Sequence, residues 1–233
     1  MSNSLTVTPR AAATVLAKLA LLLVAASVAG QLAIVVSGHD VLLGIPAFFD
    51  VDAERNLPTL FAAADLLFAA LLLALVAVLE TRRNGAYILQ WWLLACGFIY
   101  LAVDESTSLH ERIGRAVAHQ VGFDDFAGWV VPFVPILLVL GVTFFRFLLF
   151  LPTVTRIRFM VAGAIYLGGA IGMEVVAGRF SPVHKESLVY SMFATIEESA
   201  EMGGVIIFIW ALLDYLGENF REVSFRLGRP PQP

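Results

Sequence analysis

The sequence predicts an all-α integral membrane protein, a single polytopic bundle of six transmembrane helices. Of its 233 residues, 59% are hydrophobic and only 15% are charged, whereas soluble domains are about half apolar and a quarter charged. The mean hydropathy of +0.84 agrees with this class. Six apolar runs are long enough to span a bilayer, which takes about 20 mostly apolar residues. These runs lie at about 12–36, 58–79, 86–104, 129–151, 157–178 and 187–216. Their short connections leave no room for a soluble domain, so residues 1–233 form one membrane domain.

The first run, 12–36, has some features of a secretory signal, because Arg10 precedes it and the small residues "SVAG" lie within it. Apolar regions of secretory signals usually have 7–15 residues, and this run has about 25. We therefore expect it to be retained as a membrane anchor.

The charges predict that both termini are cytoplasmic, because Lys and Arg are enriched in cytoplasmic loops. With that orientation, ten of the 15 Lys and Arg lie inside. They are Arg10, Lys18, Arg82, Arg83, Arg146, Arg156, Arg158, Arg221, Arg226 and Arg229. Only four of the 19 acids lie inside, namely Glu80, Asp214, Glu218 and Glu222. The chemistry of the protein is therefore expected on its outer face.

Run 58–79 carries Asp65 two turns from its outer end, and an acidic segment, "FFDVDAERNLPTLF", leads into it. Asp50, Asp52 and Glu54 alternate there as at the front of a calcium loop. The central glycine of such a loop is missing, and Phe61 replaces its final glutamate, so an EF-hand is excluded. We regard these four acids as secondary site candidates at an acidic mouth.

Run 86–104 ends in "YLAVDESTSLHERIG" and is expected to continue as a helix towards His119. At about 100° per residue, Asp104, Ser108 and Glu111 share one face, which Glu105 and His110 flank. The alternative is an ordinary solvated helix end. Cys96 is the sole cysteine, so a disulfide framework and a thiolate metal cluster are excluded.

Runs 129–151 and 157–178 follow, and only the second carries a site candidate. Gly168 and Gly172 form a G-x-x-x-G pattern that favours close helix packing. Glu174 lies on nearly the opposite side, close enough to the boundary for its carboxylate to reach water. Both packing and function are open at this position.

The last run, 187–216, contains Glu197, Glu198 and Glu201 within "FATIEESAEMGG". They lie roughly ten residues, or about 15 Å, below the outer surface. No Lys or Arg lies between Lys185 and Arg221 to neutralise them. Intramembrane acids usually face a bundle interior, pair with another group and mark function.

Arginines, bound protons or a bound cation could compensate these acids. Arg112, Arg115 and Arg179 lie near the surface and are too few for every acid. Carboxylates with imidazole bind a divalent cation such as Zn²⁺, Mn²⁺, Fe²⁺ or Ca²⁺. The predicted ligands are Asp104, Glu105, His110, Glu111, Glu174, Glu197, Glu198 and Glu201.

The segments "FFDVDAERNLPT", "VDESTSLHE" and "EESAEMGG" resemble a group of uncharacterised bacterial multi-pass membrane proteins with DE…HE and EE-x-x-E-M motifs. The resemblance covers about residues 48–216. It implies a six-helix membrane protein, and no particular mechanism follows from it.

Three functions stay open at this point. The first is a metal site facing the periplasm or exterior from a bacterial cytoplasmic membrane, with or without catalysis on a lipid or small molecule. The second is an ion- or proton-coupled transporter that uses the glutamates, and the third is a non-catalytic subunit or assembly factor. The sequence has no nucleotide-binding loop, hydrolase elbow or basic nucleic-acid patch, and it leaves the oligomeric state open.

Overall fold

The structure, a computed structural model, describes residues 8–37, 44–110, 112–113, 116, 130–173, 176 and 188–220, with only the backbone of 130–133 and 188. All regular elements within these ranges are helices. They are α1 (Pro9–Ser37), α2 (Ile45–Phe49), α3 (Leu57–Arg82), α4 (Ile88–Thr107), α6 (Val130–Phe150), α7 (Thr153–Leu167), the π-helix η1 (Gly168–Met173) and α9 (Leu188–Asn219). The predicted all-α class is confirmed.

Five helical stretches are long and apolar enough to cross a membrane. They are Pro9–Ser37, Leu57–Arg82, Ile88–Thr107, Thr153–Met173 and Val189–Asn219. A shorter apolar stretch, Val134–Phe150, belongs to α6. These helices indicate a lipid bilayer environment, and each of the six predicted apolar runs overlaps one of them.

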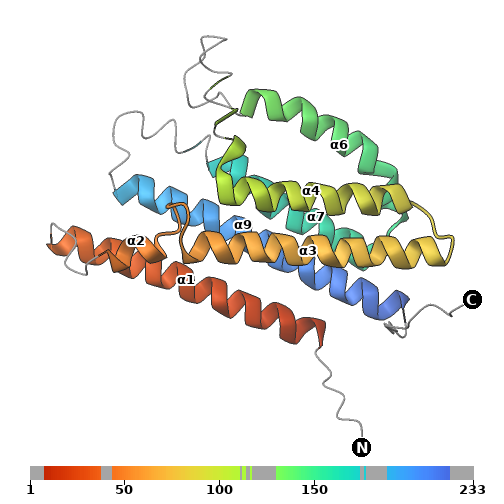
Figure 1. Cartoon of the computed structure of the whole chain (residues 1–233), viewed down its shortest axis with the longest axis horizontal. Helices are drawn as coiled ribbons and strands as arrows, with labels where there is room; N and C mark the ends of the chain where they lie inside the picture. The colour runs from red at the N-terminus through yellow and green to blue at the C-terminus, as the bar shows by residue number, and fades with distance from the viewer. Residues whose placement is uncertain are drawn as a thin grey trace, which may run out of the picture.

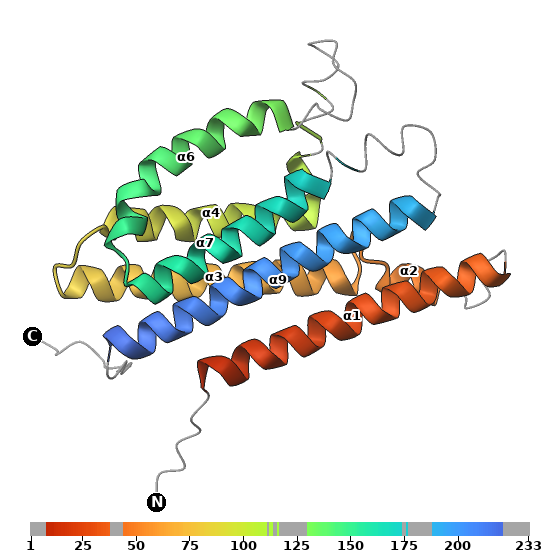
Figure 2. The same ribbon diagram turned by 180° about the vertical axis from the view of Figure 1, so that it is seen from behind.

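The long helices lie side by side along one axis of the molecule (Figure 1). Helix α9 contacts α1, α3, α7 and η1, and α3 packs along α4. The start of α1 and the end of α9 lie at the same end of the bundle in both views (Figures 1 and 2). We call this the basic end, because Arg82, Arg83, Arg156 and Arg158 belong to it. At the opposite, acidic end, α3 and α9 begin and α4 ends.

The apolar core is densest towards the basic end, where aromatic rings from four helices meet. Trp91 of α4 is 1% exposed and packs edge-on against Phe147 of α6, with ring centroids 4.8 Å apart. Tyr215 of α9 lies 5.2 Å from the same indole. Nearer the middle, Phe98 stacks on Phe208 at 4.7 Å. This packing fixes α4 and α9 and so positions the residues they carry at the acidic end.

Helix α4 ends earlier than the sequence pattern predicts. The helix expected to continue towards His119 is interrupted at Ser108, which adopts left-handed backbone angles with φ 48°. Helical residues resume after this turn, at 109–110, 112–113 and 116. The Ser108 amide donates a 2.7 Å hydrogen bond to the carbonyl of Asp104, closing the last turn. Because of this break, the continuous helical face that carries Asp104 ends before Ser108. Glu111 and His119 lie outside the described residues.

The G-x-x-x-G prediction is also wrong in its register. A Cβ added to Gly168 or Gly172 would meet nothing within 4 Å, so neither glycine is at a close helix contact. Gly169 provides that contact instead, with an added Cβ 2.9 Å from the carbonyl oxygen of Glu197 on α9. Gly169 follows Ala162 by seven residues and Tyr166 by three, so it shares the helix face with these two residues that contact α9.

Candidate functional site

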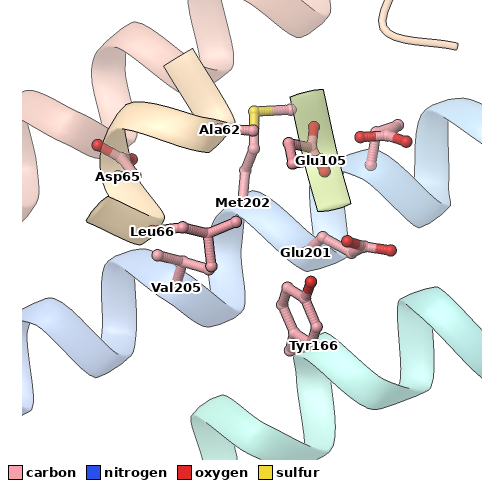
Figure 3. A pocket seen from close by; sticks show the side chains of 9 residues that line it. Ala62, Asp65, Leu66, Glu105, Tyr166, Glu201, Met202 and Val205 are labelled. Carbon is pink, nitrogen blue, oxygen red and sulfur yellow. The ribbon is translucent and has the colours of Figure 1, made fainter. Parts of the chain in front are cut away.

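A small cavity lies inside the acidic half of the bundle, between α3, α4, α7 and α9 (Figure 3). Its inner space is about 10 Å³, which is room for about one water molecule. The apolar residues that line it are Ala62, Leu66, Met202 and Val205, and the polar ones are Asp65, Glu105, Tyr166, Glu198 and Glu201. Four of the five polar groups are therefore carboxyls.

Tyr166 and Glu201 form a direct pair across the α7–α9 contact. The Tyr166 hydroxyl points at Glu201 and donates a hydrogen bond to its carboxyl (Figure 3). Glu198 precedes Glu201 by one turn of α9, so both lie on the same side of that helix. Glu105 of α4 interacts electrostatically with both of them. Three partly buried carboxyls thus share one low-dielectric space.

Asp65 contributes a second feature of this cavity. It is 5% exposed, and its Oδ2 is buried without a hydrogen-bond partner among the residues that the structure describes. Figure 3 shows Asp65 on the other side of Met202 from Glu105 and Glu201. An unpaired buried carboxyl oxygen costs about 1–3 kcal/mol, so a proton, a water molecule or a cation is expected beside it.

Asp104 and His110 form a pair just above the cavity. The His110 Nδ1 atom lies 2.7 Å from Asp104 Oδ2, and the His110 amide donates a 2.7 Å hydrogen bond to Asp104 Oδ1. The turn at Ser108 makes this arrangement possible, since it folds the chain back over α4. Asp104 orients the ring through Nδ1, so Nε2 is the nitrogen that could bind a cation or exchange a proton. His110 also interacts electrostatically with Glu105 and Glu201.

The carboxylates of the acidic segment between α2 and α3 have two different roles. Glu54 accepts a hydrogen bond from the Ser108 hydroxyl and interacts with Glu105, and Asp52 interacts with Glu198. Asp50 has a structural role, because its Oδ1 accepts hydrogen bonds from Gln31 at 3.1 Å and from the Asp52 amide at 3.2 Å. Asp52 and Glu54 therefore extend the acidic cluster towards solvent.

Arginine does not neutralise these acids. Among the described residues, Glu105, Glu198, Glu201 and Asp65 form no ion pair with Lys or Arg. The acids of the basic end differ, because Glu80 pairs with Arg83 and Asp214 pairs with Arg158. The hydrogen bond to Glu80 raises the pKa of the Arg83 guanidinium above its ordinary value. The uncompensated carboxyls are thus at the acidic end.

A complete metal-ligand set is not formed by the side chains that the structure describes. No three His, Cys, Asp or Glu residues within the described ranges converge closely enough to hold a metal ion. Two of the predicted ligands, Glu111 and Glu174, lie outside those ranges. The described candidates nevertheless form one electrostatically connected cluster rather than scattered surface acids.

The structure brings together most of the sequence-predicted residues, with two differences. Glu197 does not line the cavity, whereas Glu198 and Glu201 do. Sequence reasoning missed Tyr166, which is the cavity's one polar lining residue without a carboxyl. Its position among glycines and alanines in "AGAIYLGG", near the middle of an apolar run, was the available signal.

The model of one protein family, described as a domain of unknown function (DUF8692), matches residues 14–216. The chain belongs to this family. The matched range includes every residue of the cavity, the Asp104–His110 pair and the acidic segment before α3. No curated protein and no solved structure matches the chain. Membership of this family assigns no activity to the chain.

Proposed function

We propose that the acidic end is a cation-binding site within the membrane, and that its ligand is a divalent metal ion. The observation that carries this proposal is the shared cavity of Glu105, Glu198 and Glu201, three carboxyls without a Lys or Arg partner among the described residues. A bound cation would compensate their charge, and intramembrane acids without such compensation are costly.

The donor set fits a hard or borderline cation. Carboxylate oxygens and one imidazole nitrogen are ligands of Mn²⁺, Fe²⁺, Zn²⁺ and Ca²⁺ sites. The proposed ligands are Glu105, Glu198, Glu201 and His110. Asp104 orients the imidazole through its Nδ1 atom. Glu111, Glu174 and Glu197 complete the proposed set. Asp65 supplies the unpaired oxygen at the opposite wall of the cavity.

In this proposal the protein has six spans, α6 included, and lies in a bacterial cytoplasmic membrane with both termini in the cytoplasm. The acidic end then faces the periplasm or the exterior. The charge distribution supports this orientation, because ten of the 15 Lys and Arg lie on the same side as the two termini. The location of the α1 start and the α9 end at one end of the bundle also supports it (Figure 1).

Metal analysis of purified protein tests the proposal. We expect a stoichiometric divalent metal in the wild type and a strongly reduced content in Glu198→Gln, which keeps the side-chain size and removes the charge. Glu218→Gln is the matched control, since Glu218 is exposed near the end of α9 at the basic end. Absence of bound metal after reconstitution with Mn²⁺, Zn²⁺, Fe²⁺ and Ca²⁺ would overturn the proposal.

A second candidate is proton binding by the same carboxyls, as in a proton-coupled transporter. The observation that favours it is that the described side chains do not converge into a three-ligand site, while the cavity accommodates about one water molecule. The packed aromatic core towards the basic end counts against a continuous water path. Proton uptake by proteoliposomes that is lost in Glu198→Gln, without any metal requirement, would favour this candidate over the metal site.

A further inference from the structure

Two glycine contacts flank the Tyr166–Glu201 hydrogen bond, one from each helix. A Cβ added to Gly204 of α9 would lie 2.8 Å from the Ala162 carbonyl oxygen and 2.9 Å from Tyr166 Cβ. A Cβ added to Gly169 of η1 would lie 2.9 Å from the Glu197 carbonyl oxygen and 3.4 Å from Glu201 Cγ. Each glycine thus makes room for the functional side chain of the opposite helix.

The glycines allow a backbone approach that larger residues exclude. Contacts of 2.8–2.9 Å to backbone atoms can be relieved only by separating the helices, because backbone atoms cannot rotate away. The π-helix η1 begins two residues after Tyr166, and its Gly169 faces α9. Single π-turns occur frequently at functional sites. The two glycines therefore allow Tyr166 and Glu201 to lie close together.

We propose that Tyr166 is the positioning residue of the cation site, and that the Gly169 and Gly204 contacts hold it against Glu201. This inference rests on the proposed function and deepens it. By donating to one oxygen of the Glu201 carboxyl, the Tyr166 hydroxyl fixes its orientation and leaves the other oxygen for a ligand. A carboxylate that is oriented before binding loses less conformational freedom when the cation arrives.

Removal of the Tyr166 hydroxyl is the first test. In metal titrations of full-length protein with Mn²⁺ and Zn²⁺, we expect Tyr166→Phe to weaken binding about 10- to 100-fold, the usual range for partners that orient a metal ligand. Tyr87→Phe is the matched control, because Tyr87 packs against Phe147 at the basic end and does not line the cavity. Equal affinities of wild type and Tyr166→Phe would overturn the inference.

Infrared spectroscopy of the metal-free protein reports the hydrogen bonding of carboxyl groups. A purely structural role of Tyr166 would not change these bands. We expect the carboxyl stretching bands of Tyr166→Phe to differ from those of the wild type, and this difference to disappear in the Glu201→Gln background. Tyr87→Phe should leave the bands unchanged. Identical spectra of Tyr166→Phe and wild type would contradict the Tyr166–Glu201 pairing.

The glycine contacts are tested by a pair of neighbouring substitutions. Gly169→Ala introduces the contacts given above, whereas Gly168→Ala meets nothing within 4 Å. We expect Gly169→Ala to lower Mn²⁺ affinity at least tenfold and to change the carboxyl bands as Tyr166→Phe does, while Gly168→Ala has neither effect. Equal behaviour of the two variants would overturn the positioning role of Gly169.

These measurements separate the inference from the proposed function. If the wild type binds no metal, the metal site is wrong, and the infrared comparison still decides whether Tyr166 positions Glu201. If the wild type binds metal and Tyr166→Phe binds it equally well, the metal site stands and the role of Tyr166 is wrong.

Discussion

The hydroxyl of Tyr215 donates a 2.8 Å hydrogen bond to Oε1 of Glu80, joining α9 to α3 at the basic end. Glu80 is 2% exposed, and Arg83 Nε donates a 2.8 Å hydrogen bond to its other oxygen. The carboxylate therefore has both a counter-charge and a second donor. Glu198 and Glu105 have no such partner among the described residues. One fold thus contains a fully satisfied buried acid and a set of acids left available for binding.

Loss of the Tyr215 hydroxyl should destabilise the bundle without affecting the acidic end. We expect Tyr215→Phe to lower the free energy of unfolding by about 1–2 kcal/mol, because a buried carboxylate loses one donor. Thermal unfolding in detergent, followed by circular dichroism, measures this change. Metal content should equal that of the wild type. A loss of metal binding in this variant would show that the two ends are coupled.

Gly85 should tolerate alanine only when Glu80 is absent. A Cβ at Gly85 would lie 1.9 Å from Glu80 Oε2, so Gly85→Ala must displace the buried carboxylate from Arg83. We expect Gly85→Ala to cost about 2 kcal/mol or more in the wild type. In a Glu80→Ala background, the added cost should fall below about 0.5 kcal/mol.

The matching double-mutant cycle measures this coupling by thermal unfolding of all four proteins. Equal costs of Gly85→Ala in both backgrounds would contradict the direct clash with Glu80.

Much of the fold follows from the sequence, because lipid exposure leaves a strong signal. The predicted runs 58–79 and 187–216 correspond to α3 (Leu57–Arg82) and α9 (Leu188–Asn219) within a few residues. Apolar length reports where a helix lies in the bilayer, and a carboxyl in such a run, as at Glu198, is conspicuous whatever the packing. The helices that carry the candidate acids were therefore predictable.

The rotation and local breaks of the helices could not be predicted in the same way. Membrane helices are apolar on nearly every side, so periodicity does not reveal which side of 157–178 packs on α9. Gly169 is the contact residue instead of Gly168, and the turn at Ser108 brought His110 back onto Asp104. Tyr166 was missed for the same reason, since its partner depends on helix rotation.

The α7–α9 contact should distinguish two adjacent glycines of α9. In an ideal helix, alanine is favoured over glycine by about 1 kcal/mol, so Gly203→Ala, which meets nothing within 4 Å, should stabilise the protein or leave it unchanged. Gly204→Ala should lower stability by about 1–3 kcal/mol, because its Cβ would contact backbone atoms of Ala162 and Tyr166. Thermal unfolding of both variants measures this difference in stability. Equal stabilities would contradict a backbone contact at Gly204.

Labelling of single cysteines should determine the orientation. Cys96 is the sole cysteine and lies exposed on α4, so a Cys96→Ala protein is a suitable background. Arg112→Cys places a thiol just beyond the acidic end of α4, and Ala86→Cys places one in the exposed α3–α4 connection at the basic end. With the acidic end outside, a membrane-impermeant maleimide should label Arg112→Cys in intact bacterial cells. Ala86→Cys should react only after the cells are permeabilised. The reverse pattern would mean that the carboxyl cavity opens towards the cytoplasm, and the cation would then have to come from that side.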